Sequence, residues 1–362
     1  MKKIISLLVV IIIFIFLGLL VFLPKRNFSE NENRYLEKMV KFNFRNIKSG
    51  KFQKSVDNYF SDHFPLRDLL LGSKNKVFHI LGVYRMNDVY YTYDNKLIEE
   101  FNKPKNNKKI VRIINKFSKK NSDKNISFLL APTSLYVYED NISKYNLNYS
   151  EDDVIDYYKK HLDTNFIDVR ESMKSHKSEY IYYNSDHHWT TLGAYYAYKD
   201  FCQYNNMRCD NFNYKKVSDD FRGTLYSKVL DKSTKKDYII KVDNRNEYNI
   251  IADDIVLNQF YDDNYLNKKD KYSYFLGGNR GLITIENNNT NSIDSILIIK
   301  DSYANCFIPF ISNNYKNIYV VDPRYYENSI DELIDSYNIK NILFIYNVLT
   351  IDDDIGILSI NM

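Results

Sequence analysis

The longest uninterrupted apolar stretch of the chain lies at its beginning. Residues 4–23 read IISLLVVIIIFIFLGLLVFL and contain no charged side chain. An α-helix of twenty residues is about 30 Å long, which matches the hydrocarbon thickness of a bilayer. Two lysines precede the stretch, and the following LPKR lacks the small-x-small pattern of a signal-peptidase site. The pattern predicts an N-terminal membrane anchor over residues 1–26, with a cleaved signal peptide as the alternative, and an extracytoplasmic location for the remainder.

Apolar positions recur with helical spacing in the region that follows. Phe52, Val56, Tyr59 and Phe60 stand at i, i+4, i+7 and i+8, which predicts a helix over residues 51–62. Pro65 interrupts this pattern, which then resumes. Together with a polar juxtamembrane stretch, these helices define a linker and helical N-terminal region over residues 27–105.

Four short apolar segments occur later in the chain. They are residues 126–131, 295–299, 318–321 and 342–346. Each is continuous rather than alternating, which is typical of strands buried on both faces of a parallel sheet. Polar stretches of helical length separate them, including residues 192–201 and 330–337. The alternation predicts an α/β fold with a doubly wound, mostly parallel sheet.

This α/β domain is expected to occupy residues 106–362. Residues 203–292 fit the alternation least well, because they are rich in Asn, Asp, Lys and Tyr. They are predicted to form an insertion or an extra sheet.

Composition excludes several classes of protein. Among the 362 residues, 50 basic and 46 acidic side chains give a net charge of +4, too balanced for a dedicated nucleic-acid binder. Three cysteines without a CxxC pair exclude a disulfide-dense scaffold and give no indication of zinc. Cys202 and Cys209 are candidates for one disulfide, with two free thiols as the alternative.

Two of the six histidines lie next to an aspartate and the single tryptophan. The segment reads Ser185-Asp186-His187-His188-Trp189-Thr190. If it is extended, Asp186 and His188 point to the same side, whereas His187 points away. A carboxylate beside an imidazole fixes its tautomer and stabilises the imidazolium that forms when the ring takes a proton. Thr190 is expected to cap the following helix.

Two alternatives remain for this segment. One is a polar strand end with incidental histidines. The other is a metal site formed by Asp186, His187 and His188, although further ligands are not obvious in the sequence.

Ser302 follows the apolar segment 295–299, in the sequence Lys300-Asp301-Ser302-Tyr303-Ala304-Asn305. A serine at the end of a buried strand exposes its hydroxyl at the carboxyl edge of the sheet, near backbone N–H groups that favour developing negative charge. By itself the pattern also fits a serine that only caps a helix. With Asp186 and His188, however, the three residue types of a nucleophilic triad are present.

Asp186–Trp189, followed by Asp301–Ala304, resembles the DHHW protein family, which is related to the alginate O-acetylation proteins of the SGNH/GDSL hydrolase-like group. Further similar blocks are Asp62-His63-Phe64-Pro65-Leu66-Arg67, Gly277-Gly278-Asn279 and Asp322-Pro323-Arg324-Tyr325-Tyr326. The resemblance implies an SGNH-hydrolase-like sheet in which Asp186 orients, His188 acts as general base and Ser302 is the nucleophile. Lys300 departs from the GDS block, which has glycine before Asp-Ser.

The resemblance also implies donors for an oxyanion. They are the Ser302 N–H, a glycine N–H and an asparagine side chain, which Gly278 and Asn279 would supply; a glycine turn is the alternative. Arg324 is a candidate for binding a polysaccharide anion, with a structural ion pair as the alternative. Trp189 is a candidate sugar platform, with a place in the core as the alternative.

The predicted function is therefore O-acetylation of a cell-envelope polysaccharide by a membrane-anchored, extracytoplasmic enzyme that needs no metal or cofactor. By resemblance, a membrane O-acyltransferase would supply the acetyl group. One alternative is an acetyl esterase, which differs only in admitting water to the acyl-enzyme. The other is a non-catalytic envelope assembly or binding protein.

Overall fold

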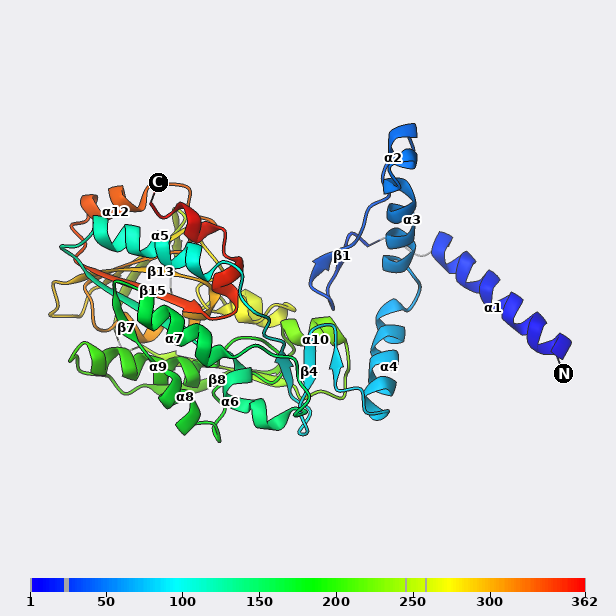
Figure 1. Ribbon diagram of the computed structural model, residues 1–362, viewed down its shortest axis with the longest axis horizontal. Coiled ribbons are helices and arrows are strands. Elements are labelled where there is room, and N and C mark those ends of the chain that lie inside the picture. The colour runs from blue at the N-terminus through cyan, green and yellow to red at the C-terminus, as the bar shows by residue number, and fades with distance from the viewer. Residues whose placement is uncertain (1, 23–25, 245, 258, 362) are drawn as a thin grey trace. The chain divides into compact units, whose positions relative to one another are not determined.

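The computed structural model describes the chain except residues 1, 23–25, 245, 258 and 362 (Figure 1). The chain divides into two compact units. The first runs to Asn87 and also includes Tyr226–Ser233, and the second comprises Asp88–Leu225 and the chain from Thr234 onward.

The first unit is mainly helical. Its elements are α1 (Lys2–Phe22), β1 (Phe28–Ser29), β2 (Arg34–Tyr35), α2 (Phe44–Lys48), α3 (Lys51–Asp62), α4 (Arg67–Ile80) and β3 (Arg85–Met86). The helix predicted over residues 51–62 is confirmed, and its pattern resumes as α4 after Pro65. Within the described residues, no helix combines the length and apolar character that crossing a membrane requires.

The Asp62 block of the sequence has a structural role in this first unit. Asp62 is buried, and its two carboxylate oxygens accept hydrogen bonds from Arg34 at 2.5 and 2.9 Å. The Glu37 backbone N–H also donates to Asp62. These bonds hold the pKa of Asp62 below its usual range against the opposing effect of burial. The carboxylate thus fastens the β1–β2 hairpin to the end of α3.

The second unit is built on an eight-stranded sheet with the order β11-β10-β12-β14-β13-β15-β6-β7. The strands are β6 (Asn125–Ala131), β7 (Asn165–Ile167), β10 (Tyr248–Ala252), β11 (Ile255–Leu257), β12 (Leu282–Asn287), β13 (Ser295–Lys300), β14 (Asn317–Val321) and β15 (Asn341–Asn347). The five strands from β14 to β7 are parallel, and β12, β10 and β11 continue the sheet with antiparallel pairings. The predicted α/β fold with a mostly parallel sheet is confirmed.

All four apolar segments of the sequence are strands of this sheet. In β13, β14 and β15 every residue after the first is buried, as their continuous apolar character predicts. In register, Leu343 lies opposite both Ile298 and Ser127, so β15 is enclosed by a strand on either side.

Helices cover both faces of the sheet. They are α5 (Asn107–Lys120), α6 (Ser134–Tyr138), α7 (Glu151–His161), α8 (Arg170–Ser175), α9 (Thr191–Tyr204), α11 (Ile308–Ile311) and α12 (Ile330–Ser336). Phe117 of α5 packs against Phe344, and Tyr158 of α7 stacks on Phe128, so these two helices share one face. In Figure 1, α5 and α12 lie on one side of β13 and β15, and α9 lies on the other. The predicted helices at residues 192–201 and 330–337 are thus confirmed.

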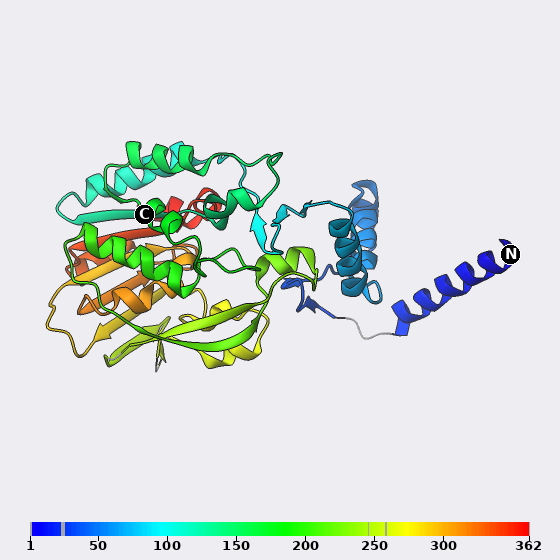
Figure 2. The same cartoon turned by 90° about the horizontal axis from the view of Figure 1, so that it is seen from below.

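Residues 203–292 contribute more than a peripheral insertion. β10, β11 and β12 extend the main sheet, whereas β8 (Asn213–Phe221) and β9 (Asp237–Asp243) form a separate two-stranded sheet, visible as the long green and yellow ribbon in Figure 2. α10 (Thr224–Val229) follows β8, and two short 3-10 helices, η2 (Asp263–Asn267) and η3 (Tyr272–Tyr274), precede β12. Cys202 and Cys209 are free thiols.

Candidate active site

The candidate site lies at the carboxyl edge of the parallel strands. Ser302 opens the 3-10 helix η4 (Ser302–Cys306), two residues after β13 ends at Lys300. Asp301, rather than Ser302, is the N-cap of η4, because its side chain accepts a hydrogen bond from the Tyr303 N–H at 2.9 Å. The alternative in which Ser302 only caps a helix is therefore wrong, and its hydroxyl is available for another contact.

The segment that carries the two histidines is a bend and not an extended strand. Tyr182 and Trp189 form an isolated antiparallel bridge, and residues 184–188 turn between them. Asp186 and His188 meet because the Asp186 carboxylate accepts the His188 backbone N–H at 3.1 Å. As predicted, Thr190 caps the following helix, α9, by accepting the Gly193 N–H.

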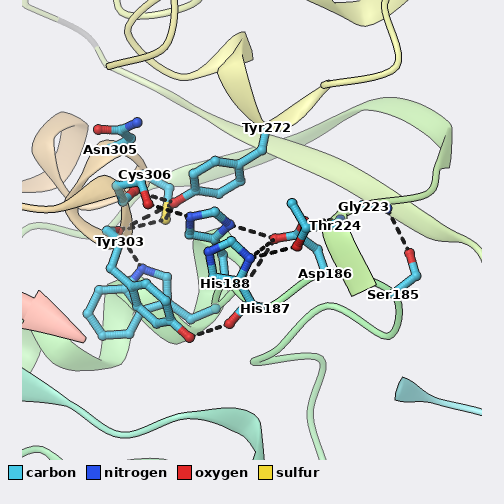
Figure 3. Close-up of polar contacts among 12 residues, drawn as sticks. Ser185, Asp186, His187, His188, Gly223, Thr224, Tyr272, Tyr303, Asn305 and Cys306 are labelled. Atoms are coloured by element: carbon cyan, nitrogen blue, oxygen red, sulfur yellow. Dashed lines mark hydrogen bonds and ion pairs between the residues drawn. The ribbon is translucent and has the colours of Figure 1, made fainter. Parts of the chain in front are cut away.

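The structure brings Asp186, His188 and Ser302 into one hydrogen-bonded row (Figure 3 shows the two histidines and Asp186). Asp186 Oδ1 lies 2.5 Å from His188 Nδ1, and His188 Nε2 lies 2.9 Å from Ser302 Oγ, across 114 residues of sequence. With a proton on Nδ1 donated to Asp186, the lone pair of Nε2 accepts the Ser302 hydroxyl proton. This is the arrangement by which an imidazole activates a hydroxyl nucleophile.

Burial and neighbouring charge set the protonation of the pair. Burial, reinforced by the adjacent His187, lowers the pKa of His188 to about 4, although Asp186 opposes the shift. Burial acts against ionisation of Asp186, but the two imidazoles and the Thr224 N–H hold the pKa of Asp186 well below its usual range. At neutral pH, Asp186 is therefore ionised and His188 is neutral, the state in which His188 accepts a proton.

The second oxygen of Asp186 is held by the first residue of α10. Asp186 Oδ2 accepts hydrogen bonds from Thr224 N at 2.8 Å and from Thr224 Oγ1 at 3.0 Å. Gly223 makes this approach possible, because a Cβ at residue 223 would lie 2.1 Å from Asp186 Oδ2. His187 does not point away from the site, since its Nδ1 lies 2.7 Å from Thr224 Oγ1.

A second buried carboxylate, Asp237, fixes the backbone just before Asp186. Its Oδ1 accepts from the Tyr180 hydroxyl, the Asn184 N–H and the Asn184 side chain at 2.6–2.8 Å. Its Oδ2 accepts from the N–H and hydroxyl of Ser185 at 2.8 and 2.5 Å. Five hydrogen bonds to two oxygens favour an ionised carboxylate, against the effect of burial, which raises the pKa of Asp237. In this way Asp237 anchors the bend.

Lys300 occupies the position at which the GDS block has glycine, and its ammonium is completely buried. Lys300 Nζ donates to Asn305 Oδ1 at 2.8 Å, to Asp322 Oδ2 at 3.3 Å and to Asn279 Oδ1 at 3.4 Å. Asn279 Oδ1 also accepts from Asn305 Nδ2 at 3.1 Å. Because its oxygen faces these two donors, the Asn279 amide nitrogen faces away from them. Burial lowers the pKa of Lys300, against the effect of Asp322.

Three of the candidate binding residues have other roles in the structure. The Gly278 N–H donates to the Phe275 carbonyl at 3.1 Å, so it is committed to a turn and not to an oxyanion. Arg324 forms a two-point ion pair with Asp322, with contacts of 2.8 and 2.6 Å. This is the structural ion pair that the sequence offered as the alternative to binding an anion. Trp189 is fully buried and donates to the Tyr303 carbonyl at 2.7 Å, so it presents no face to a sugar.

Asp186, His187 and His188 also have the composition of a metal site, since one ligand atom from each lies within 4.8 Å of the others. Three of the four imidazole nitrogens have protein partners instead. His188 Nδ1 pairs with Asp186, its Nε2 pairs with Ser302, and His187 Nδ1 pairs with Thr224. This pattern of contacts fits a hydrogen-bonded triad better than a set of ligands converging on an ion.

Three residues within 203–292 support the triad and were not identified from the sequence. Thr224 and Asp237 belong to this region, and so does Tyr272, whose ring stacks on His188. The glycine of the Gly223-Thr224 pair is the one local sign of close packing. Asp237 and Tyr272 are single residues among many of their type, without a spacing that marks them.

Comparison with known structures places the fold among several bacterial proteins. A DHHW family protein from Eubacterium siraeum superposes with a TM-score of 0.67 at 24% identity, covering 75% of this chain and 95% of that protein. Bacillus cereus PatB1, solved with a sulfonyl adduct, superposes with a TM-score of 0.63 at 20% identity, covering 76% and 98%. At these identities the similarity establishes the fold.

Comparison with curated proteins gave no match. The model of the DHHW protein family, in contrast, matches residues 79–321, which is two thirds of the chain and includes all three residues of the row. The chain belongs to the DHHW protein family.

Proposed function

We propose that this protein is an O-acetyltransferase of a cell-envelope polysaccharide, with Ser302 as the nucleophile. The single observation that carries the proposal is the 2.9 Å contact between His188 Nε2 and Ser302 Oγ, with Asp186 on the opposite side of the same ring. The acetyl group and the polysaccharide acceptor come from the resemblance of the Asp186 and Ser302 motifs to the alginate O-acetylation proteins.

The reaction proceeds in two balanced halves. His188 Nε2 takes the Ser302 hydroxyl proton while Oγ attacks the acetyl carbonyl carbon, and the leaving alcohol then takes that proton from His188. The product is acetyl-Ser302. A sugar hydroxyl next attacks this ester while His188 takes its proton, and Ser302 Oγ leaves with that proton restored to it.

Each tetrahedral intermediate carries a negative oxygen that needs hydrogen-bond donors. The Asn279 amide nitrogen is the side-chain donor in this proposal, because Lys300 and Asn305 hold its oxygen in place. Asn305 lies one turn of η4 beyond Ser302 and therefore on the same face of that 3-10 helix. The Ser302 N–H at the start of η4 is the backbone donor.

The location follows from the chemistry of the acceptor. A cell-envelope polysaccharide lies outside the cytoplasm, and the uncharged residues 4–23 supply the proposed N-terminal anchor. A membrane O-acyltransferase is the proposed donor of the acetyl group. Protease added outside intact cells should then digest residues 27–362, whereas protection of this part would contradict the proposed topology.

Incubation with a chromogenic acetyl ester tests the nucleophile. The protein should gain the mass of one acetyl group on the peptide that contains Ser302, and a sulfonyl reagent, chosen because PatB1 forms a sulfonyl adduct, should block this labelling. Ser302→Ala should abolish both reactions. Ser312→Ala is the matched control, because it removes another buried serine hydroxyl, which donates to Ile308 at 2.8 Å.

The fate of the acetyl group separates transfer from hydrolysis. Acetylated oligosaccharide formed in excess over free acetate supports transfer, whereas free acetate alone identifies an esterase. Unmodified Ser302 after incubation with acetyl esters and with the sulfonyl reagent would overturn the proposal and leave a binding protein.

A further inference from the structure

The His188 imidazole is covered on one face by an aromatic ring from a distant part of the chain. Tyr272 opens η3, and its ring lies parallel to His188, with centroids 3.6 Å apart and an angle of 9° between the planes. Figure 3 shows this ring beside the imidazole. The Tyr272 side chain is buried, with 5% of the residue exposed.

The stacked ring supplies a constraint that the hydrogen bonds of the triad lack. Asp186 holds Nδ1 and Ser302 holds Nε2, and these two contacts define a line through the imidazole. Rotation of the ring about this line leaves both contacts nearly unchanged in length but tilts the ring plane. Contact with a parallel ring stops that rotation, so Tyr272 sets the plane in which the Nε2 lone pair lies.

The hydroxyl of the same tyrosine reaches the nucleophile. Tyr272 Oη lies 3.0 Å from the Ser302 carbonyl oxygen, with longer contacts to the Tyr303 carbonyl and Cys306 Sγ. Burial raises the pKa of Tyr272 well above its usual value, so the hydroxyl keeps its proton and donates it to a hydrogen bond. One side chain therefore contacts both the proposed base and the backbone of the proposed nucleophile.

The stack also changes with the charge of the imidazole. When His188 takes a proton, the face of the Tyr272 ring attracts the resulting cation. The other groups around His188 are Asp186 and His187 on its own segment, Asp270 on the Tyr272 segment, and Ser302 and Tyr303 on η4.

We propose that Tyr272 is a positioning residue for acyl transfer, which holds the plane of the His188 ring with its own ring and the turn at Ser302 with its hydroxyl. This inference rests on the proposed function of Ser302 and adds to it a residue that neither motif contains. It also assigns a role to the segment before β12, which brings Tyr272 to the triad from outside the parallel strands.

Three variants separate positioning from stability. Tyr272→Phe keeps the stack and loses the hydroxyl, and Tyr272→Leu loses both. Tyr274→Leu is the matched control, because Tyr274 is also buried in η3 but stacks on Tyr261, away from His188. Each variant is compared with the unmodified full-length protein by thermal melting, by kcat and KM for an acetyl ester, and by an NMR titration of the histidine rings.

Tyr272→Leu should lower kcat by roughly 10–100-fold, as expected when a reacting group is misplaced, and should leave KM nearly unchanged. Tyr272→Phe should lower kcat by only about 2–10-fold, the value of one hydrogen bond, and should therefore be more active than Tyr272→Leu. Tyr272→Leu has two opposing effects on the pKa of His188: reduced burial of the imidazole raises it, and loss of the ring that attracts the imidazolium lowers it. We expect a net rise, because burial is the main cause of the low pKa of His188.

Tyr274→Leu should melt lower but keep kcat and the His188 titration of the unmodified protein. Equal kcat values for Tyr272→Leu and Tyr274→Leu at equal folded fraction would overturn the inference, as would an unchanged His188 titration in Tyr272→Leu. The NMR titration needs no turnover. If the unmodified protein is inactive but the pKa of His188 still changes in Tyr272→Leu, the proposed reaction is refuted and the positioning role is not.

Discussion

Asp237→Asn is the most stringent test of how the site is held, because the change is isosteric and lies outside the triad. Asp237 accepts five hydrogen bonds, and four of them come from the backbone and side chains of Asn184 and Ser185, immediately before Asp186. Asparagine replaces one of the two acceptor oxygens with an NH₂ group. At least one buried donor, the Ser185 or the Asn184 N–H, then faces another donor.

The cost of this substitution follows from the contacts. One orphaned buried donor costs about 1–3 kcal/mol, and each remaining hydrogen bond weakens by about 0.5–1 kcal/mol when the acceptor loses its charge. Relief from burying an anion offsets part of this sum, since burial is the main cause that raises the pKa of Asp237. We expect a net loss of about 2–4 kcal/mol in the free energy of unfolding, and a decrease of roughly 4–7 °C in Tm.

Activity should fall together with stability. A displaced Ser185 moves Asp186 relative to the His188 ring, and a shift of about 1 Å in such a group costs roughly 100-fold in rate. The assays are thermal melting and kcat for an acetyl ester, measured well below Tm. Asp243→Asn is the matched control, because Asp243 ends the same strand, β9, but is exposed.

An Asp237→Asn variant with the Tm and kcat of the Asp243→Asn control would refute the anchoring role. A lower Tm with unchanged kcat would show that the bend keeps its shape without the carboxylate. That result would separate the stability of the loop from the geometry of Asp186.

Three further changes test the triad and its surroundings. His188→Ala should abolish acetyl-ester turnover while His187→Ala retains much of it, as steady-state kinetics will show; an essential His187, or activity lost to chelators and restored by a divalent ion, would instead favour a metal site. His188 must be neutral to accept the Ser302 proton, and its pKa is lowered to about 4. The value of kcat/KM should therefore stay level as the pH falls from neutrality and decline about tenfold per pH unit below that pKa. A half-maximum of kcat/KM near the ordinary histidine pKa would contradict this. Lys300→Met should lower the free energy of unfolding by about 1–3 kcal/mol in a denaturant titration. This is less than a broken buried ion pair usually costs, because Asp322 keeps Arg324 as a partner. A loss of about 5 kcal/mol or more, the upper end for such a pair, would show that Arg324 does not compensate.

The local properties of the chain were readable from its sequence. Continuous apolar segments identified β6, β13, β14 and β15, because a strand with neighbours on both edges and helices on both faces disfavours polar side chains. The spacing of apolar residues likewise identified α3, and a stretch of helical length between apolar segments identified α9. The triad candidates were identified by residue type, by their position after apolar segments and by resemblance to a family.

The tertiary structure decided which polar groups meet. The sequence suggested an extended Asp186–His188 segment. In the structure this segment is a bend, held by hydrogen bonds to Asp237, which is 52 residues from Ser185. Tyr272 reaches His188, and Lys300 reaches Asp322, through the order of strands and not through any periodicity. A hydrophobic pattern predicts which side chains are buried, because an apolar side chain can pack against any apolar neighbour. A hydrogen bond needs two particular partners, and for residues far apart in sequence only the path of the folded chain brings them together.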